Sequence, residues 1–496
     1  MSQKRLRHSY VMLIILLILT LSLLAITTRQ VNAQTPAEGE TYTIGRYKTI
    51  PVPYNATVVA AYVSDIKNDG NYAFIRVTQD GTVRVFSLDG NTIWTRYLKK
   101  TITYSLLFDM DRDNLPELLL GTSDGYIIEL DPASFGLTVF NTYLTSDFPV
   151  LKIVPANIDS DNQSEFIVVQ ENGPISIVDN TGTFLKSYRY YAKFADVVAT
   201  DINNDNSSEI FLVTSDGKIR IMYPNGTDIF STSILGEHFT SVIAADVDND
   251  GLPEFFVAGV KTLYVYASDG TQLKTRSFDY SILKMAIVDL DKNGIDDLMI
   301  LSGNELYSIN ARTILLNNFV ELPKNYTISN MVFLNIDTDD ALEILLTTYQ
   351  GVILIYDNDF SLFRVYTVEA SAPIYSCEVI DLDSDGYDEF VVAGRLRNVV
   401  LLGIDTDGDG LLNIEENTIT KTNPNLIDTD GDQMSDYDEY LNGRNPLMYD
   451  SDYDGIPDGL DITNGINDTF FYAAILLVFI GVPGYKYIQL RKEETV

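Results

Sequence analysis

The sequence predicts an all-β fold: a β-propeller of eight four-stranded blades, followed by an acidic stalk and one C-terminal transmembrane helix. An acidic pattern recurs at intervals of 43 to 48 residues along most of the chain. Several β-rich runs accompany each copy, and repeats of about 45 residues with four short strands are typical of propeller blades. A lone blade cannot bury both faces of its sheet, whereas a ring of blades can.

The N-terminus reads as a secretory signal peptide over residues 1–33, with a short linker at 34–41. Lys4, Arg5 and Arg7 precede an apolar run that extends from about Val11 to Ile26. The small residues before position 34 predict cleavage after Ala33. The alternative is an uncleaved membrane anchor.

The repeat is an acidic alternation with a carboxylate eight residues after its start. The first of eight copies along the chain, DIKNDGNYA (65–73), lacks the closing carboxylate and has Lys67 at its third place, so we expect no calcium there. If that copy is not a blade, the ring has seven blades. The complete copies are DMDRDNLPE (109–117), NIDSDNQSE (157–165), DINNDNSSE (201–209), DVDNDGLPE (246–254), DLDKNGIDD (289–297), NIDTDDALE (335–343) and DLDSDGYDE (381–389).

Each repeat follows one plan, which the fifth copy illustrates. Strand-like runs at 242–247, 254–259 and 263–268 are followed by Asp-Gly and a fourth run. The final repeat lacks its fourth run, because the acidic segment begins at Asp405. We therefore expect the spare run TYTIGRYKTI (41–50) to complete the last blade and close the ring, which limits exposed strand edges. The propeller then covers 42–404.

The copy DVDNDGLPEF (246–255) resembles the calcium loops of FG-GAP/VCBS-type repeats, which occur in integrin α propellers and many microbial surface proteins. The resemblance covers about 42–404 and implies side-chain ligands at places 1, 3, 5 and 9, with the carbonyl of place 7. The alternative is a set of polar turns without metal. The implied ligands are Asp109, Asp111, Asp113, Glu117, Asn157, Asp159, Asp161, Glu165, Asp201, Asn203, Asp205, Glu209, Asp246, Asp248, Asp250, Glu254, Asp289, Asp291, Asn293, Asp297, Asn335, Asp337, Asp339, Glu343, Asp381, Asp383, Asp385 and Glu389.

Place 6 of each loop provides a check, because a tight loop needs a residue there that tolerates positive φ. All eight occupants are Gly, Asn or Asp, the residues that adopt positive φ most readily. They are Gly70, Asn114, Asn162, Asn206, Gly251, Gly294, Asp340 and Gly386.

Residues 405–416, DTDGDGLLNIEE, have the spacing of a twelve-residue calcium loop. Ca²⁺ takes about six to eight oxygen ligands, and such a loop supplies them from places 1, 3, 5, 7, 9 and 12, with Gly at place 6. Two further copies start at Asp428 and Asp450, although Gln433 replaces the preferred Gly in the second. The alternative is an acidic, solvated linker. The predicted ligands are Asp405, Asp407, Asp409, Asn413, Glu416, Asp428, Asp430, Asp432, Asp436, Glu439, Asp450, Asp452, Asp454, Asp458 and Asp461.

The residues between these loops argue against EF-hands, because about ten residues are too few for two helices. Together with Asn423-Pro424 and Asn445-Pro446, the loops resemble thrombospondin type 3 repeats over about 405–461. The resemblance implies calcium ions along an extended rod with little hydrophobic core. Calcium is thus the one cofactor that we predict. It would also serve as a staple in a chain whose single cysteine, Cys377, excludes an intrachain disulfide.

The charge bears on the partner, and the two ends of the chain predict a cell-surface location. The formal net charge is −36, which argues against a nucleic-acid partner because phosphate binding needs clustered Lys and Arg. After a linker at 462–468, an apolar segment predicts a membrane span at 469–488, and the tail 489–496 is basic at its start. Because basic residues stay on the cytoplasmic side, we expect the bulk outside and the C-terminus inside.

Catalysis finds little support in the sequence. We predict no catalytic residue; His238, Arg395 and Arg397 are candidates only if the protein is a polysaccharide lyase. The favoured function is recognition or adhesion through an extracellular protein or glycan, and a structural envelope component is a further alternative. An aromatic residue precedes nearly every innermost strand, where it could stack on a ligand or plug a gap between blades. These residues are Tyr54, Tyr104, Phe148, Tyr191, Phe239, Tyr280, Tyr326 and Tyr375.

Overall fold

The computed structural model describes residues 43–51, 57–88, 90–110, 112–133, 137–140, 148–159, 163–171, 173–189, 193–337, 339, 341–395, 398–453 and 455–461. The predicted signal peptide, transmembrane helix, cytoplasmic tail and linkers lie outside these residues. Within the described part of the chain, no helix has both the length and the apolar character that a membrane crossing needs.

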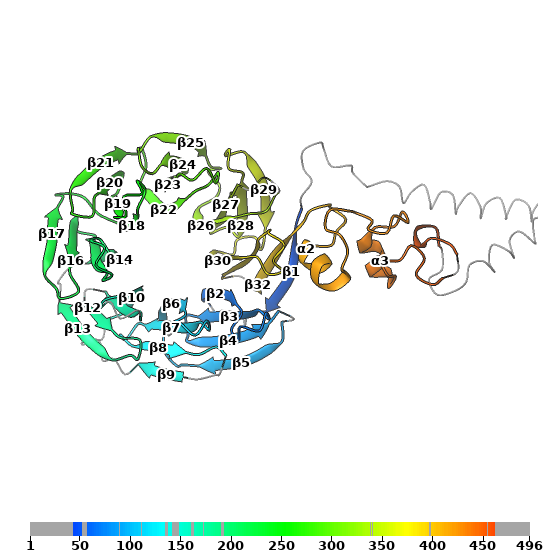
Figure 1. Ribbon diagram of the computed structural model, residues 1–496, viewed down its shortest axis with the longest axis horizontal. Helices are drawn as coiled ribbons and strands as arrows, with labels where there is room; N and C mark the ends of the chain where they lie inside the picture. Colours follow the sequence, from blue (N-terminus) through cyan, green and yellow to red (C-terminus); the bar gives the residue numbers. More distant parts are fainter. Residues whose placement is uncertain are drawn as a thin grey trace, which may run out of the picture.

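Eight antiparallel sheets of four strands stand in a ring, so the prediction of eight blades is confirmed (Figure 1). The decayed first repeat does form a blade. Blades 1 to 4 contain β2 (Val58–Ser64), β3 (Ala73–Thr78), β4 (Thr82–Ser87), β5 (Thr92–Tyr97); β6 (Ile102–Phe108), β7 (Glu117–Thr122), β8 (Ile127–Leu130), β9 (Leu137–Phe140); β10 (Val150–Ala156), β11 (Glu165–Gln170), β12 (Pro174–Val178), β13 (Phe184–Arg189); and β14 (Phe194–Thr200), β15 (Glu209–Thr214), β16 (Lys218–Met222), β17 (Asp228–Ser233).

The other four blades follow the same order, from the innermost strand outwards. Blades 5 to 8 contain β18 (Ser241–Ala245), β19 (Glu254–Ala258), β20 (Thr262–Tyr266), β21 (Gln272–Ser277); β22 (Ile282–Val288), β23 (Asp297–Ser302), β24 (Glu305–Asn310), β25 (Leu316–Glu321); β26 (Ile328–Leu334), β27 (Glu343–Thr348), β28 (Val352–Tyr356), β29 (Leu362–Thr367); and β30 (Ile374–Ile380), β31 (Glu389–Gly394), β32 (Asn398–Asp405), β1 (Thr43–Pro51).

The ring is closed by the N-terminal strand, as the spare run in the sequence predicts. β1 pairs antiparallel with β32 from Thr43 opposite Asp405 to Pro51 opposite Asn398. It supplies the outermost strand of blade 8, whose other three strands come from the end of the repeat region. Blade 8 is therefore built from both ends of the propeller sequence.

The hydrophobic core lies between neighbouring blades. The second strand of each blade is buried almost throughout, as in β19 (EFFVA) and β27 (EILLTT), because both faces of the sheet are covered. One core cluster, for example, joins Phe256 and Val265 of blade 5 to Ile300 and Ile309 of blade 6. The innermost strands are only partly buried, as in β6 and β22, which is consistent with a solvated central channel.

Hydrogen bonds also tie the blades together at the outer edge of the ring. Side chains of an outermost strand donate to backbone carbonyls in the hairpin before the outermost strand of the next blade. Trp94 Nε1 lies 3.1 Å from the oxygen of Pro132, and Arg276 donates to the oxygen of Ile314 at 2.9 Å. Such contacts hold neighbouring blades in register without adding strands.

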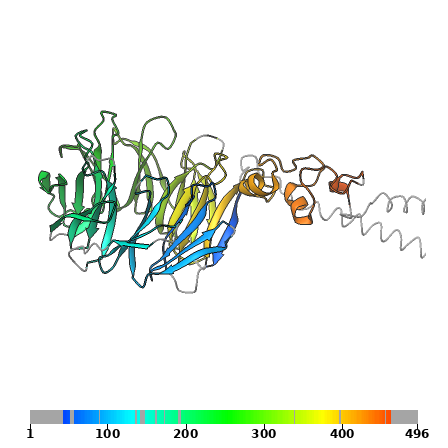
Figure 2. The ribbon, with the colours of Figure 1, turned by 60° about the horizontal axis from the view of Figure 1, so that its bottom comes forward.

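Residues 405–461 project from the edge of the ring (Figures 1 and 2). They contain α2 (Asn413–Glu415), a π-helical turn η1 (Glu416–Thr420), α3 (Asp436–Asn442) and a 3-10 turn η2 (Asp458–Leu460). The segment begins directly at the end of β32, and Leu412 and Ile414 join the core cluster between blades 8 and 1. A Cβ atom on Gly45 of β1 would lie 2.6 Å from Leu412 Cδ2, so glycine leaves the space that Leu412 fills.

Candidate metal-binding loops and channel face

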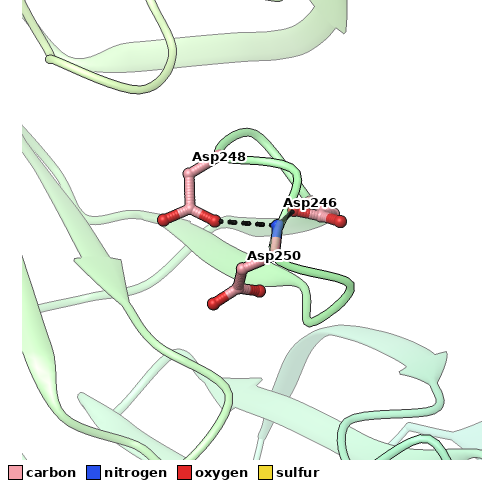
Figure 3. A group of neighbouring side chains, drawn as sticks. All are labelled: Asp246, Asp248 and Asp250. Carbon is pink, nitrogen blue, oxygen red and sulfur yellow. Dashed lines mark hydrogen bonds between the residues drawn. The ribbon is translucent and has the colours of Figure 1, made fainter.

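The nine-residue loops connect the innermost strand of each blade to the second strand. In blade 5, one oxygen of Asp246 accepts from the backbone N–H of Asp250 at 3.2 Å, and the other accepts from Gly251 at 2.8 Å. Asp248 also accepts from the N–H of Asp250 at 3.2 Å (Figure 3). The side chains at places 1 and 3 therefore shape the turn and bring their carboxylates together.

The carboxylate at place 9 lies beneath the loop. Glu254 begins β19, and its Oε2 accepts from the N–H of Val247 at place 2, at 3.2 Å. The same bond links Glu117 to Met110, Glu165 to Ile158, Glu209 to Ile202, Glu343 to Ile336 and Glu389 to Leu382. One oxygen of each of these carboxylates thus fixes the loop. The other accepts from Asn203 Nδ2 at 3.3 Å in Glu209 and has no hydrogen-bond partner in Glu343.

Blade 7 shows most clearly that a cation would fit such a loop. Glu343 is fully buried, and its Oε1 has no hydrogen-bond partner. Asn335 Oδ1 is also buried without a partner. Burial and, to a smaller extent, the charges of Asp337 and Asp339 together raise the pKa of Glu343 to about 8. Oxygens that converge without donors are the ligand set that Ca²⁺ prefers.

The first loop differs in charge and in closure. Burial acts to raise the pKa of Asp65, but the N–H groups of Gly70, Asp69, Lys67 and Asn68 together outweigh it and lower that pKa. Its two carboxylate oxygens are taken up by three of these N–H groups at 2.7–3.2 Å. Hydrogen bonds between the Asp65 carboxylate and these backbone N–H groups therefore hold the turn in its shape.

Backbone conformation agrees with the residue types at place 6. Asn114, Asn206, Gly251 and the other described occupants all have positive φ, whereas Asn162 and Asp340 lie outside the described residues. Place 4 also has positive φ, which we did not predict. Its described occupants are Asn68, Arg112, Asn204, Asn249, Lys292 and Ser384, of which Arg112, Lys292 and Ser384 have no preference for that region.

The twelve-residue loops repeat the first nine places of the blade loops. Asp436, at place 9, accepts from the N–H of Thr429 at place 2, at 2.9 Å, as the blade glutamates do. Place 12 then adds a carboxylate that the shorter loops lack. Glu439 is 0 % exposed, and neither of its oxygens has a hydrogen-bond partner; Glu416 Oε2 is likewise buried without one.

Like charges crowd these sites. Burial raises the pKa of Glu439 to about 8, and the carboxylates of Asp430, Asp432 and Asp458 contribute to the rise. Burial also raises the pKa of Glu416 to about 9, with Asp407 and Asp409 contributing. A bound divalent cation would relieve this repulsion.

Successive twelve-residue loops contact each other through one repeated hydrogen bond. Asp409 Oδ2 accepts from the N–H of Tyr437 at 2.8 Å, and Asp432 Oδ2 accepts from the N–H of Gly459 at 2.7 Å. In both pairs, place 5 of one loop meets place 10 of the next. This contact sets the step between loops.

Arg444 is a residue of this segment that our sequence analysis missed. Its side chain is 6 % exposed, and its Nη2 lies 3.2 Å from Asp461 Oδ2. Its Nη1 donates to the carbonyl of Asp458. The guanidinium therefore neutralises the closing carboxylate of the third loop, which makes this loop unlike the first two.

The structure brings several sets of predicted ligands together, and Asp111, Asp161 and Asp454 lie outside the described residues. Groups whose ligand oxygens all lie within 4.8 Å of one another include Asp246, Asp248 and Asp250; Asp337, Asp339 and Glu343; Asp381, Asp383 and Asp385; Asp405, Asp407 and Asp409; and Asp428, Asp430 and Asp432.

The aromatic residues before the innermost strands do not form one uniform ring. Tyr280 is 52 % exposed, and Phe148 and Tyr375 are also exposed. Tyr104 and Tyr326 pack partly against core clusters. Phe239 is a core residue, 1 % exposed, with its ring edge against Tyr264. Tyr54 and Tyr191 lie outside the described residues.

A ring of mostly polar residues lies on the innermost strands, five positions before each loop. In the sequence, alignment of the repeats on their loops would have found it. In seven blades a β-bulge precedes this position, and bulges change the direction of side chains. The residues of this polar ring are Ala60, Tyr104, Lys152, Asp196, Ser241, Lys284, Asn330 and Ser376.

Members of the polar ring bridge neighbouring blades. Lys152 Nζ lies 2.6 Å from Asp196 Oδ1, and Asp196 Oδ2 accepts from Ser241 Oγ at 3.1 Å. Lys284 has only a longer contact, 3.4 Å to Asn330 Oδ1, and no carboxylate pairs with it among the described residues. Burial lowers its pKa. The channel thus contains a lysine whose charge is not neutralised nearby.

Two of the candidates for lyase chemistry lie on different blades. His238 precedes β18 of blade 5; it is exposed, and its Nδ1 contacts the carbonyl of Ser215. Arg395 is exposed directly after β31 of blade 8, and Arg397 lies outside the described residues.

A model of the FG-GAP-like repeat family matches residues 201–257, from the loop of blade 4 into β19 of blade 5. A comparison with curated protein sequences gave no match. Solved propeller structures are similar over most of the chain. Sqt1 from Saccharomyces cerevisiae has a TM-score of 0.56 and 9% identity, over 72% of this chain and 98% of that one.

Two further solved structures agree. The computationally designed Ika8 protein has a TM-score of 0.54 and 12% identity, over 72% of this chain and 99% of that one. BamB from Moraxella catarrhalis has a TM-score of 0.51 and 14% identity, over 73% and 97% of the two chains. These likenesses show the fold alone. The chain is an eight-bladed β-propeller that contains an FG-GAP-like repeat.

Proposed function

We propose that this protein is a calcium-stabilised recognition propeller, displayed outside the cell on a short calcium-bound stalk with a membrane anchor. The observation that carries the calcium proposal is the set of buried carboxylate oxygens without donors at Glu343, Glu416 and Glu439. Calcium would be held in the turns between the first two strands of the blades and in the twelve-residue loops of segment 405–461. The signal peptide and the membrane span that we predict from the sequence support the location.

The calcium sites have a structural role in this proposal. Each candidate ion would be held by one loop, with the place 9 carboxylate already bonded to the backbone, as in Glu254. Such a site is closed by protein ligands and leaves little room for a substrate. Calcium would therefore stiffen the turns at one rim of the ring and the segment 405–461.

Calcium binding is tested by the melting temperature of the full chain with calcium and with a chelator. We expect the melting temperature to fall on chelation, because ligand binding to the native state stabilises it. Glu439→Gln should lower the melting temperature in calcium but raise it in chelator, since it removes a buried charge from a crowded site. Asp438→Asn, an exposed neighbour on α3, is the matched control. An unchanged melting temperature on chelation would contradict calcium binding.

Recognition would take place at the channel mouth opposite the acidic loops. Exposed rings, including Tyr280 and Tyr375, lie at the beginning of innermost strands, and Tyr349 packs edge-on against Tyr375 at 6.0 Å between ring centroids. The polar ring lies further along the same strands. Aromatic faces beside hydrogen-bonding groups suit a sugar or a peptide.

The recognition proposal is tested by glycan arrays and by cross-linking on intact cells, with the full chain. Tyr280→Ala and Tyr375→Ala should each weaken binding of a captured glycan or protein about tenfold. Tyr97→Ala, an exposed ring on the outermost strand β5, should leave it unchanged. Unsaturated sugar products would instead establish a lyase, and equal loss in all three variants would contradict this binding face.

A further inference from the structure

Segment 405–461 contacts the propeller at the acidic loop of blade 8. Asn417 lies on η1, just beyond the first twelve-residue loop. Its amide Nδ2 donates to Asp383 Oδ2 and to Asp385 Oδ2, both at 3.0 Å. These two oxygens belong to places 3 and 5 of the blade 8 loop. A side chain from outside the propeller therefore enters a predicted metal site of the ring.

The loop that Asn417 contacts contains three neighbouring carboxylates that a cation could neutralise. Oxygens of Asp381, Asp383 and Asp385 lie within 4.8 Å of one another, and Asp383 Oδ1 is buried with no hydrogen-bond partner. The NH₂ group of Asn417 brings only partial positive charge to this cluster.

Packing holds Asn417 over the loop. Leu412 and Ile414 are buried in the core between blades 8 and 1, so the start of this segment is fixed to the ring. Lys421 Nζ donates to the carbonyl of Asn417 at 2.6 Å, which holds the backbone of η1. Neither contact depends on a metal. The amide is thus positioned before any ion binds.

We infer that Asn417 is an additional protein ligand of the calcium ion in the blade 8 loop, and that it links the stalk to the ring. An amide can exchange its Nδ2 and Oδ1 positions by turning about its last bond, without movement of the backbone. Oδ1 would then lie about as far from the two carboxylate oxygens as neighbouring ligands do around one Ca²⁺, roughly 3 Å for a shell of radius about 2.4 Å. This inference rests on the proposed calcium binding.

Two consequences distinguish a ligand from a plain hydrogen-bonding residue. Calcium in the blade 8 loop would bind more tightly than the loop alone allows. The same ion would protect η1 against local opening, because its release would require Asn417 to leave the coordination shell. A residue that only neutralised the empty loop would compete with calcium instead.

The test is hydrogen exchange of the full chain during a titration with Ca²⁺ alone, for the wild type, Asn417→Ala and Asn417→Asp. Peptides over 381–389 and 413–420 report the junction, and peptides over 246–254 report a loop without such a contact. Ile419→Ala is the matched control, because Ile419 is an exposed neighbour on η1. All variants keep Leu412 and Ile414, so the fold of the junction is retained.

We expect Asn417→Ala to raise the calcium midpoint of 381–389 about tenfold, as loss of a site-supporting group typically does. The midpoint of 246–254 should stay unchanged, and calcium protection of 413–420 should weaken. Asn417→Asp should retain tight binding. An unchanged or lowered midpoint in Asn417→Ala would overturn the inference while calcium binding stands. If calcium does not slow hydrogen exchange of 246–254 in the wild type, the proposed function itself is contradicted.

Discussion

At the scale of single residues, the loops are defined by which backbone conformations each place must adopt. Gly251 and Asn206 at place 6 were readable from the sequence, because few residue types tolerate positive φ. The positive φ at place 4 was not readable, since Arg112 and Lys292 give no sign of it. The carboxylates at places 1 and 3 accept hydrogen bonds from N–H groups of the loop, as Asp246 and Asp248 do from Asp250, and these bonds hold the turn in that conformation.

Gln433 occupies place 6 of the second twelve-residue loop with φ of 82°. A side chain with a Cβ is strained there, so Gln433→Gly should raise the free energy of unfolding by about 1 kcal/mol. Urea denaturation in calcium measures the change. Gly455→Ala, at the same place of the third loop, should lower it by a similar amount, because its φ is 92° and only backbone strain is introduced. If backbone strain at place 6 is the cause, the two substitutions must change the free energy of unfolding in opposite directions.

At the scale of elements, the strands and their order followed from β-rich runs and from the spacing of the loops. The apolar runs within β19 and β27 predict that these strands are buried on both faces, as the structure has them. The polar ring was missed because its residues differ from blade to blade, and only the ring places Lys152 beside Asp196. Contacts between neighbouring repeats are invisible in a single repeat.

The acidic loops predict how stability without calcium depends on pH. Burial among like charges raises the pKa of Glu343 to about 8 and those of Glu389 and Glu416 to about 9. In chelator the folded state therefore binds more protons than the unfolded state from about pH 4.5 to 9, so stability should fall as pH rises through this range. Melting curves between pH 5.5 and 8.5 measure this.

Saturating calcium should reverse this slope or remove it. The ion requires ionised ligands, so its binding strengthens as the carboxylates lose protons. A chelated protein whose melting temperature rises from pH 5.5 to 8.5 would contradict the crowding of charge described for these loops.

The junction between β32 and the acidic segment depends on one aliphatic side chain. Leu412 is buried against the space left by Gly45, so Leu412→Ala should cost about 2–5 kcal/mol through lost burial and a cavity. Hydrogen exchange should increase in β1 and η1. Ile419→Ala, on an exposed side chain nearby, should have little effect. Equal effects of both changes would show that Leu412 does not hold the junction.

At the scale of the whole molecule, ring closure was predictable because the sequence contains one strand too many at its start and one too few at its end. The attachment of the acidic segment to the ring was not predictable from the sequence. The packing of Leu412 between blades 8 and 1 and the hydrogen bonds of Asn417 to the blade 8 loop depend on the folded propeller. The sequence describes repeats well and their junctions poorly.

Removal of β1 tests closure. A chain that starts at residue 52 should expose the edge of β32 and leave blade 8 with three strands. We expect a lower melting temperature and self-association, because an open strand edge pairs with other chains. A chain that starts at residue 43 retains β1 and should behave as the full chain does. Size-exclusion chromatography separates the outcomes, and a monomeric, equally stable shorter chain would contradict the closure role.

The position of β32 determines how mechanical tension on the C-terminal segment would enter the ring. β32 is hydrogen-bonded along both edges, to β31 and to β1. A pull on residue 406 would therefore be divided between two antiparallel ladders within one blade. Neighbouring blades would feel it only through side-chain packing. β1, the strand that closes the ring, would therefore also resist extraction of β32 under force.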